Sequence, residues 1–243
     1  MTQQETGGLL AIWVDIDDDY LLQFLKWHNC EHIPERLSIP GFRAGRRYRS
    51  LDAVSDFLIL YETLKADVLT AEPYLRRLNN PTPRTRDALQ HFRHPIRTVY
   101  SLIAELGPGR PALNPGFMLV HRFDCMPTDE HVLLEWYESE VMAKICAISN
   151  VHSGSLYRSR PELSQTKTLE LDLHMAGPAA QRFLGLYEIS SWEVAETKPW
   201  RGAFSGPASE TGPHRYMANC VEELYWLDFA MYTKRPHEKE AHS

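Results

Sequence analysis

The segment FLILYE (57–62) returns as FLGLYE (183–188), and the similarity extends well beyond these six residues. Residues 7–50 align without a gap on residues 116–159, and both stretches end in the tripeptide YRS. Pro73-Tyr74 falls on Pro199-Trp200 when the second alignment is continued. Internal similarity of this kind indicates duplicated structural units. The sequence therefore predicts two versions of one unit in a single chain.

Each unit shows the same order of predicted elements. An apolar stretch at 9–16, repeated at 117–124, is typical of a strand, and 19–33 has apolar residues at helical spacing. Pro34 is expected to end this helix directly after His32, because proline disfavours helical geometry in the residue before it. Two strands, a helix and a last strand should follow, at 42–50, 57–62, 68–78 and 96–104, the last repeated at 221–232. The order βαββαβ is that of a ferredoxin-like unit.

The predicted domains follow from the repeat. The first unit should span 1–106 and the second 117–234, joined by a Gly- and Pro-rich linker at 107–116. The second unit carries an insertion at 160–182, whose alternating pattern in TKTLELDLHM fits an added hairpin or lid as well as plain surface decoration. The polar tail at 235–243 is expected to be disordered.

The stretch FLKWHNCEHIPERLSIPGFRAGRRYRS (24–50), followed by FLILYE, resembles the dimeric α/β barrel superfamily and its EthD-like branch. In that branch a helix ending in His-x-Pro precedes a Pro-Gly turn and a strand. The match covers residues 8–104, whereas the second copy keeps the framework and lacks the His-x-Pro and Pro-Gly positions. The resemblance implies an α+β fold in which two tandem ferredoxin-like units form a pseudo-dimeric α/β barrel.

The resemblance also implies a range of activities. The superfamily includes muconolactone isomerases, cofactor-free quinol-type monooxygenases, polyketide cyclases, and haem enzymes such as chlorite dismutases and aldoxime dehydratases. Its members bind small hydrophobic or aromatic molecules in the barrel cavity. A shared fold does not fix the reaction or the substrate.

Composition narrows the classes of partner. The chain has 243 residues, 43% of them hydrophobic, and a net charge of −6 without long runs of one sign, so no nucleic-acid partner is expected. No apolar stretch is long enough to cross a bilayer, and the four scattered cysteines are typical of reduced thiols, so we expect a cytoplasmic protein. A homodimer is an open alternative.

His28, Glu31 and His32 spell H-x-x-E-H, the motif of inverted zinc peptidases. Two histidines four residues apart on a helix lie on one face and are able to bracket a metal. The second copy has Glu140 opposite Glu31 but no histidine nearby, which favours a structural role for the glutamate, paired with an arginine or tyrosine of the neighbouring strand. We therefore predict no metal site, while a metal or haem stays an alternative.

Residues that differ between the copies are candidates for one asymmetric pocket. His28 lies over Tyr137, His32 over Val141, and Trp13 over Arg122. From this comparison and from residues able to donate or accept protons, the predicted catalytic residues are His28, His32, Tyr48, His121 and Tyr137. The predicted substrate-binding residues are Trp13, Arg47, Tyr61, Arg122 and His152.

His121 and Arg122 are neighbours in the predicted strand at 117–124, so one of them should point into the barrel and the other away from it. A histidine in an apolar cavity would be a neutral base, whereas an arginine would offer a fixed cation to an enolate or carboxylate. The sequence leaves both orientations open.

The leading functional expectation is a cofactor-independent lyase, isomerase or cyclase that acts on a small aromatic or otherwise hydrophobic molecule. One alternative is a metal- or haem-dependent oxidoreductase on the same scaffold. The other is a non-catalytic binding or auxiliary protein for a hydrophobic ligand.

Overall fold

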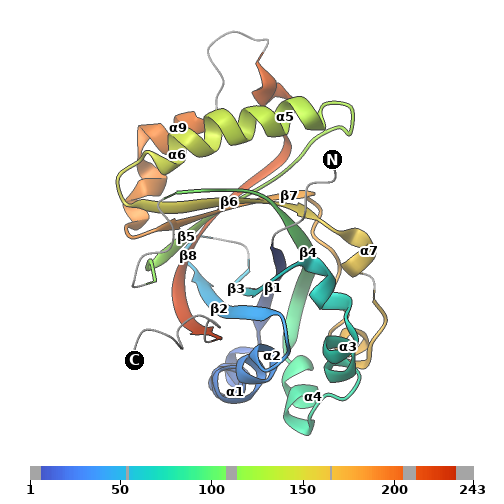
Figure 1. Cartoon of the computed structure of the whole chain (residues 1–243). Coiled ribbons are helices and arrows are strands. Elements are labelled where there is room, and N and C mark those ends of the chain that lie inside the picture. Colours follow the sequence, from blue (N-terminus) through green and yellow to red (C-terminus); the bar gives the residue numbers. More distant parts are fainter. Residues whose placement is uncertain (1–6, 53–54, 108–113, 165, 205–211, 234–243) are drawn as a thin grey trace, which may run out of the picture.

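The computed structural model describes residues 7–52, 55–107, 114–164, 166–204 and 212–233. Within them, eight antiparallel strands close into one barrel in the order β1-β3-β2-β8-β5-β7-β6-β4. Helices cover the barrel on two opposite sides (Figure 1). The fold is α+β and consists of two tandem units, as predicted.

The first unit alternates strands and helices in the predicted order. Its elements are β1 (Gly8–Ile16), η1 (Asp18–Tyr20), α1 (Leu21–Trp27), the π turn η2 (His28–His32), α2 (Ile33–Leu37), β2 (Phe42–Ser50), β3 (Phe57–Thr63), η3 (Ala66–Thr70), α3 (Glu72–Leu78), α4 (Pro83–Leu89) and β4 (Phe92–Leu106).

The second unit repeats this order and adds two short helices in its insertion. Its elements are β5 (Phe117–Asp124), α5 (Glu130–Trp136), the π turn η4 (Tyr137–Met142), α6 (Ala143–Cys146), β6 (Val151–Ser159), α7 (Pro161–Ser164), α8 (Leu169–His174), β7 (Phe183–Ile189), η5 (Trp192–Glu196), α9 (Lys198–Ala203), η6 (Pro213–Tyr216) and β8 (Ala218–Tyr232).

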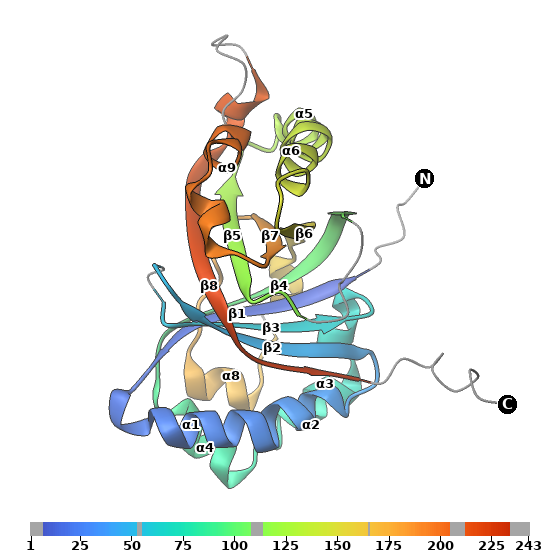
Figure 2. The same cartoon turned by 90° about the vertical axis from the view of Figure 1, so that its left-hand side faces the viewer.

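The barrel forms because the two four-stranded sheets, β4-β1-β3-β2 and β8-β5-β7-β6, pair edge to edge. The long last strand of each unit supplies the contact: β8 pairs with β2, and β4 pairs with β6. Closure removes the free edges that two separate sheets would leave. Figure 2 shows β8 running past the second unit's sheet to reach β2.

Alternate side chains of each strand point into the barrel, and large aromatic residues fill it. Trp13, Tyr48, Tyr100 and Tyr225 form its buried core together with aliphatic neighbours. Arg46 is also buried and pairs with Glu62 of its own unit and Glu188 of the other. The pocket lined by His28, His32 and Tyr61 lies outside the barrel, between sheet and helices, and not inside it as expected.

One local prediction was wrong. The first helix does not end at His32 but continues as α2 through Pro34, because the π turn before it, closed by a bond from Ile33 N–H to the His28 carbonyl, widens the helix where a proline ring would otherwise clash. Among the open alternatives for the insertion, the hairpin is excluded, because the segment forms α7 and α8, the latter capped by the Thr168 side chain, which accepts from Leu171 N–H.

The helix α8 of the insertion lies against the first unit. Although it belongs to the second unit in sequence, it lies in the helix layer of the first unit, beside α3 and α4 (Figure 2). Within the described residues, no helix is both long and apolar enough to span a membrane. The predicted disordered tail, 235–243, lies outside the described residues, as does most of the linker.

Candidate functional site

An enclosed pocket lies on the outer face of the first unit's sheet, beneath its helices. Residues of β1, β3, β4, η2, α2, α3 and α4 line it, and α8 closes it from the second half of the chain. Its volume is about 30 Å³, room for only a few small atoms. Its apolar walls are Leu10, Ile12, Ile59, Leu78, Leu89, Phe92 and Leu171, and its polar residues are His28, His32, Arg36, Tyr61, Tyr74, Arg97, Glu170 and His174.

The helix supplies three of the polar residues as one stripe. His28, His32 and Arg36 are four residues apart, and all three are at least 92% buried. The rings of His28 and His32 stack, with centroids 5.7 Å apart. The π turn extends over both histidines, and such turns are frequent at functional sites.

His28 is held by two partners. Its Nδ1 lies 2.9 Å from Nη1 of Arg47, which only donates, so Nδ1 accepts and the proton of the neutral ring is on Nε2. Nε2 lies 3.2 Å from the hydroxyl oxygen of Tyr61 and therefore donates to it. Tyr61 is then left to donate its own proton into the pocket. Burial raises the pKa of Tyr61 well above 10, so it stays protonated.

Three atoms at this site have no hydrogen-bond partner among the described residues: Nδ1 of His32, Nδ1 of His174 and Nη1 of Arg97. Each belongs to a side chain that is at least 91% buried. Buried polar groups are normally paired, because an unpaired one costs about 1–3 kcal/mol. Three such atoms around one pocket point to a ligand.

The pocket histidines are neutral. Burial, followed by the charges of Arg47 and Arg36, holds the pKa of His28 well below 6.5. Burial and then Arg36 lower the pKa of His32 in the same way, and burial with Arg97 lowers the pKa of His174 to about 4. Each ring therefore offers one N–H donor and one acceptor nitrogen at neutral pH.

Arg36 and Glu170 join the two halves of the chain at the pocket. Nη2 of Arg36 lies 2.6 Å from Oε1 and 2.5 Å from Oε2 of Glu170, and both side chains are buried. Burial raises the pKa of Glu170, and the charge of Arg36 opposes that rise. The contact fixes α8 over the pocket.

The equivalent space in the second unit is filled. His121 and Tyr137, which replace Ile12 and His28, stack with their ring centroids 5.8 Å apart, and Nδ1 of His121 lies 3.0 Å from the Tyr137 hydroxyl. Phe204, the counterpart of Leu78, packs 4.0 Å from His121 between ring centroids. His121 and Tyr137 are therefore part of an aromatic core, away from the pocket.

The other predicted site residues divide between several places. His28, His32 and Tyr61 line the pocket, and Arg47 reaches it through His28. Arg122 is the residue that points into the barrel: it lies 4.7 Å from the Trp13 ring and pairs with Glu223. The remaining two do not line the pocket: Tyr48 lies inside the barrel, and His152 is partly buried on β6.

Geometry at the H-x-x-E-H motif does not fit a metal held by both histidines, because both ring nitrogens of His28 already face Arg47 and Tyr61. Glu31 points away from the histidines: it accepts a hydrogen bond from the Thr82 hydroxyl and lies 3.7 Å from Arg84. The predicted pairing of this glutamate with an arginine or tyrosine of the neighbouring strand was therefore wrong. The pocket also does not fit a haem, since its volume is far below the roughly 300–1,000 Å³ of drug-sized ligand sites.

Five polar residues of the pocket were not predicted from the sequence: Arg36, Tyr74, Arg97, Glu170 and His174. Arg36 continues the four-residue spacing of His28 and His32, a signal that the expected break at Pro34 concealed. Glu170 and His174 are also four apart, but their segment has an alternating pattern that suggested a strand. Arg97 and Tyr74 carry no local signal, because only the folded chain brings them to the helix.

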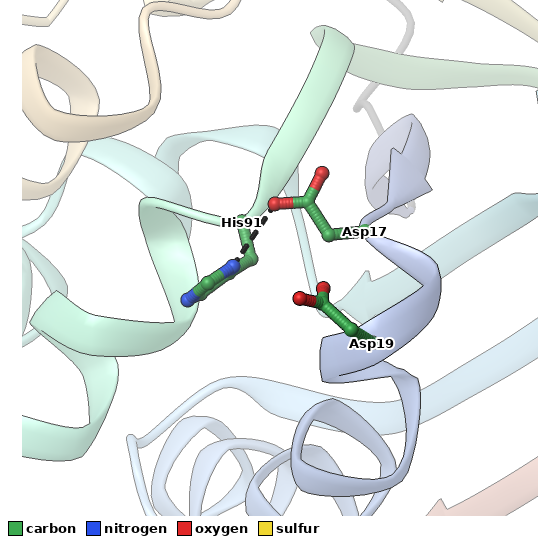
Figure 3. A group of neighbouring side chains, drawn as sticks. All are labelled: Asp17, Asp19 and His91. Carbon is green, nitrogen blue, oxygen red and sulfur yellow. Dashed lines mark hydrogen bonds and ion pairs between the residues drawn. The ribbon is translucent and has the colours of Figure 1, made fainter.

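A second polar cluster lies at the surface, where Asp17 and Asp19 face His91 (Figure 3). Nδ1 of His91 lies 2.9 Å from Asp17, and Nη2 of Arg93 lies 2.5 Å from the same carboxylate oxygen. These contacts satisfy Asp17 and place a guanidinium where a cation would have to sit. The cluster is explained as an ion-pair network.

Comparison with known proteins identifies the fold. No protein-family model matches the chain, and no curated protein sequence is significantly similar to it. Among solved structures, an anthrone oxidase-like protein superposes with a TM-score of 0.63 at 8% identity, covering 96% of this chain and 95% of the other. A monooxygenase candidate from Fusobacterium nucleatum gives a TM-score of 0.61 at 6% identity, over 95% and 96% of the two chains.

A chlorite dismutase from Candidatus Nitrospira defluvii gives a TM-score of 0.57 at 11% identity, over 93% and 92%. These likenesses extend over the whole chain and agree with the closed eight-stranded barrel of two tandem units. The protein therefore has the fold of the dimeric α/β barrel superfamily, with both halves of the barrel supplied by one chain.

Proposed function

We infer that the protein is an enzyme that transfers a proton to or from a small, largely hydrophobic molecule bound in the first-unit pocket, without a cofactor. The observation that carries this proposal is the group of three unpartnered polar atoms, on His32, Arg97 and His174, around one pocket whose lining is half polar and half apolar. The comparisons add support for an enzyme scaffold, since relatives in fold carry enzymatic names.

His32 is the proposed acid-base group. Its neutral ring accepts a proton from an acidic C–H or O–H of the substrate, or returns one to it. The low pKa of the free site disfavours a charged ring, but a substrate anion formed beside it stabilises that charge as an ion pair. Arg97 stabilises the anion by donating from Nη1, the atom with no partner in the described structure.

Tyr61 and the pocket walls have supporting roles. The Tyr61 hydroxyl, oriented by the Nε2 proton of His28, donates to a substrate oxygen, and Arg47 fixes His28 in the required tautomer. The apolar walls and α8 exclude water, which strengthens each electrostatic contact in the pocket. The residues thus combine a base, an anion stabiliser and a hydrogen-bond donor.

Oxidation of the same anion is a second candidate, favoured by the full-length similarity to an anthrone oxidase-like protein. After loss of a proton, an activated methylene reacts with O₂, and the overall change is R–CH₂–R′ plus O₂ to R–CO–R′ plus H₂O. The same residues would form the anion, and O₂ would be the second substrate. Consumption of O₂ separates this reaction from isomerisation or elimination.

Proton exchange at carbon tests the proposal without knowledge of the natural substrate. Phenylpyruvate and 2-tetralone, which both have acidic C–H groups and exceed the closed pocket of about 30 Å³, so that they enter only when α8 shifts, would be incubated with the protein in D₂O and followed by proton NMR. We expect catalysed exchange with at least one probe, and His32→Gln should lower it by about 10²–10⁴-fold, the usual value of a positioned acid-base group. The control is His131→Gln, an exposed histidine on α5.

Each other outcome has a defined meaning. Exchange no faster than in buffer with both probes, or exchange that is unchanged in His32→Gln, would contradict the proposal. Saturable binding of a probe without exchange would favour the non-catalytic binding protein. Loss of exchange in His121→Gln with normal folding would instead place the chemistry at His121, another of the predicted catalytic residues.

A further inference from the structure

The charges around the pocket do not cancel. Arg36 and Arg97 line it, and Glu170 is the one carboxylate among its lining residues. Arg36 also contacts Glu35 at 2.9 Å, but Glu35 lies 3.5 Å from the exposed Arg77 as well. With all five groups counted, the cluster keeps an excess of one positive charge.

Arg97 carries that excess. Its contact among the described residues is a long hydrogen bond from Nη2 to the Tyr74 hydroxyl, at 3.3 Å, and it makes no ion pair with a carboxylate there. Its Nη1 is unpartnered, as are Nδ1 of His32 and Nδ1 of His174. The charge of Arg97 acts on Glu170 without direct contact, but Glu170 is already bound by Arg36. A guanidinium that is 95% buried without a direct ion pair is costly unless a ligand supplies one.

We propose that the pocket's ligand is a small monocarboxylic acid with an apolar body, whose carboxylate is bound by Arg97 together with His174. A carboxylate has acceptor positions for both groups, with Arg97 supplying the charge-assisted bond and Nδ1 of His174 donating, while Nδ1 of His32 keeps its lone pair for the substrate proton. A cationic ligand would be repelled by two guanidiniums, and a neutral one would leave Arg97 unbalanced. The apolar walls match the body of the acid.

The pocket's size determines which acids enter without rearrangement. At about 30 Å³, it holds little more than a carboxylate-sized group while α8 is in place. The Arg36–Glu170 pair and a bond from Leu169 N–H to Asn79 hold α8 there. Acetate is therefore accepted by the closed form, whereas an aromatic acid requires α8 to shift and release Glu170 from Arg36.

Calorimetric titration at constant ionic strength tests this assignment, with acetate, benzoate and benzamide as probes. We expect saturable 1:1 binding of at least one acid and at least tenfold weaker binding of benzamide, the neutral analogue of benzoate. Arg97→Gln should weaken acid binding about 10- to 100-fold, the value of one charge-assisted hydrogen bond. Arg93→Gln, an exposed arginine on the same strand, is the matched control.

Glu170→Gln should have the opposite effect and strengthen benzoate binding, because it removes the competing carboxylate and weakens the contact that holds α8. Arg97→Gln should still fold, since no carboxylate loses its partner, and its thermal unfolding would be measured alongside. No saturable binding of either acid, equal binding of benzoate and benzamide, or full affinity in folded Arg97→Gln would overturn the assignment.

This inference rests on the proposed function for the identity of the site, but the two fail separately. Acid binding that depends on Arg97, without proton exchange at carbon, would leave the carboxylate site standing and remove the enzymatic role. Exchange that depends on His32 with 2-tetralone, without any acid binding, would keep the enzyme and remove the carboxylate.

Discussion

Nη2 of Arg36 in the first unit contacts both carboxylate oxygens of Glu170 in the second unit's insertion, at 2.6 and 2.5 Å. The pair is buried, and it closes a pocket whose other walls come almost entirely from the first unit. The insertion therefore makes the duplicated chain structurally asymmetric: one copy has a pocket with a cover, and the other has a filled core.

Breaking the pair from one side should be costly. Glu170→Ala leaves the Arg36 guanidinium buried with Glu35 as its remaining partner, so we expect a loss of about 3–5 kcal/mol in the free energy of unfolding. The double variant Arg36→Leu with Glu170→Ala should lose less than the two single variants together, because neither charge remains. Urea unfolding of the native protein, both single variants and the double variant measures the coupling, and additive losses would argue against a coupled pair. Glu72→Ala, in the exposed Glu72–Arg76 pair, is the control and should change little.

Stability should fall on acidification because buried histidines are neutral in the folded state. The pKa of His174 is about 4 when folded and near 6.5 when unfolded, so the unfolded chain binds the extra proton between these values. Stability contributed by neutral His174 is therefore complete above pH 6.5 and is lost as the pH falls toward 4. His28 and His32 act in the same direction.

The test compares His174→Asn with the native protein by urea unfolding between pH 7.5 and 4.5. The native protein should lose up to about 1.4 kcal/mol more per pH unit than the variant within the window from 6.5 to 4. Parallel pH profiles would mean that His174 is protonated in the folded protein, for example through an anion bound beside it.

The overall fold was predictable because the pattern of strands and helices occurs twice along the chain. The predicted strands at 9–16 and 57–62 correspond to β1 and β3, whose bounds differ from the prediction by a single residue at one end. Alternation in strands and helical spacing between them are local signals, and the duplication gave each of them twice. The tandem arrangement also explains why one chain closes a barrel by itself.

The site was only partly predictable, because its charges come from distant segments. His28 and His32 were found by comparing the copies and asking which polar residues one copy lacks, whereas Tyr61, which both copies share, was chosen as a hydrogen-bond donor. Arg97 and Glu170 had to be brought to the helix by β4 and by the packing of α8, which no local pattern encodes. The prediction of a site inside the barrel failed for a related reason. Trp13, Tyr48, Tyr100 and Tyr225 come from strands far apart in the sequence, and only the closed barrel brings them together to fill its interior. The EthD-like assignment and a homodimer stay predictions.

Gly185 leaves space for the Tyr137 hydroxyl in the second unit's core, and adding a side chain there tests whether that space is needed. A Cβ added there would lie 2.7 Å from the Tyr137 hydroxyl, which bonds His121 and Tyr187. Gly185→Ala should therefore destabilise the protein by about 1–3 kcal/mol through overpacking. Combining it with Tyr137→Phe removes the clashing oxygen, so the double variant should lose less than the sum of the two single losses in thermal unfolding. A strictly additive result would contradict the proposed clash.

A matched control for that cycle is Gly202→Ala in α9. Nothing lies within 4 Å of the added Cβ, and alanine favours the helix over glycine by about 0.5–1 kcal/mol. This variant should be slightly more stable than the native protein, alone and in combination with Tyr137→Phe, which separates the effect of space from the effect of losing a glycine.

Leu78→Phe should close the pocket without removing any polar group. In the second unit the counterpart of Leu78 is Phe204, whose ring packs against His121 and Tyr137 in the space that corresponds to the pocket. Phenylalanine at position 78 should occupy the first-unit cavity similarly, at a cost of at most about 1–3 kcal/mol in stability. Acid binding should fall at least tenfold, and proton exchange at carbon should fall with it, although His32, Arg97 and Tyr61 are all retained.

Leu75→Phe, on the same helix but outside the pocket lining, is the control for added side-chain volume. Unchanged acid binding and proton exchange in a folded Leu78→Phe protein would show that the ligand binds elsewhere. A fall of both in Leu78→Phe but not in Leu75→Phe would assign binding and exchange to the cavity that α8 covers.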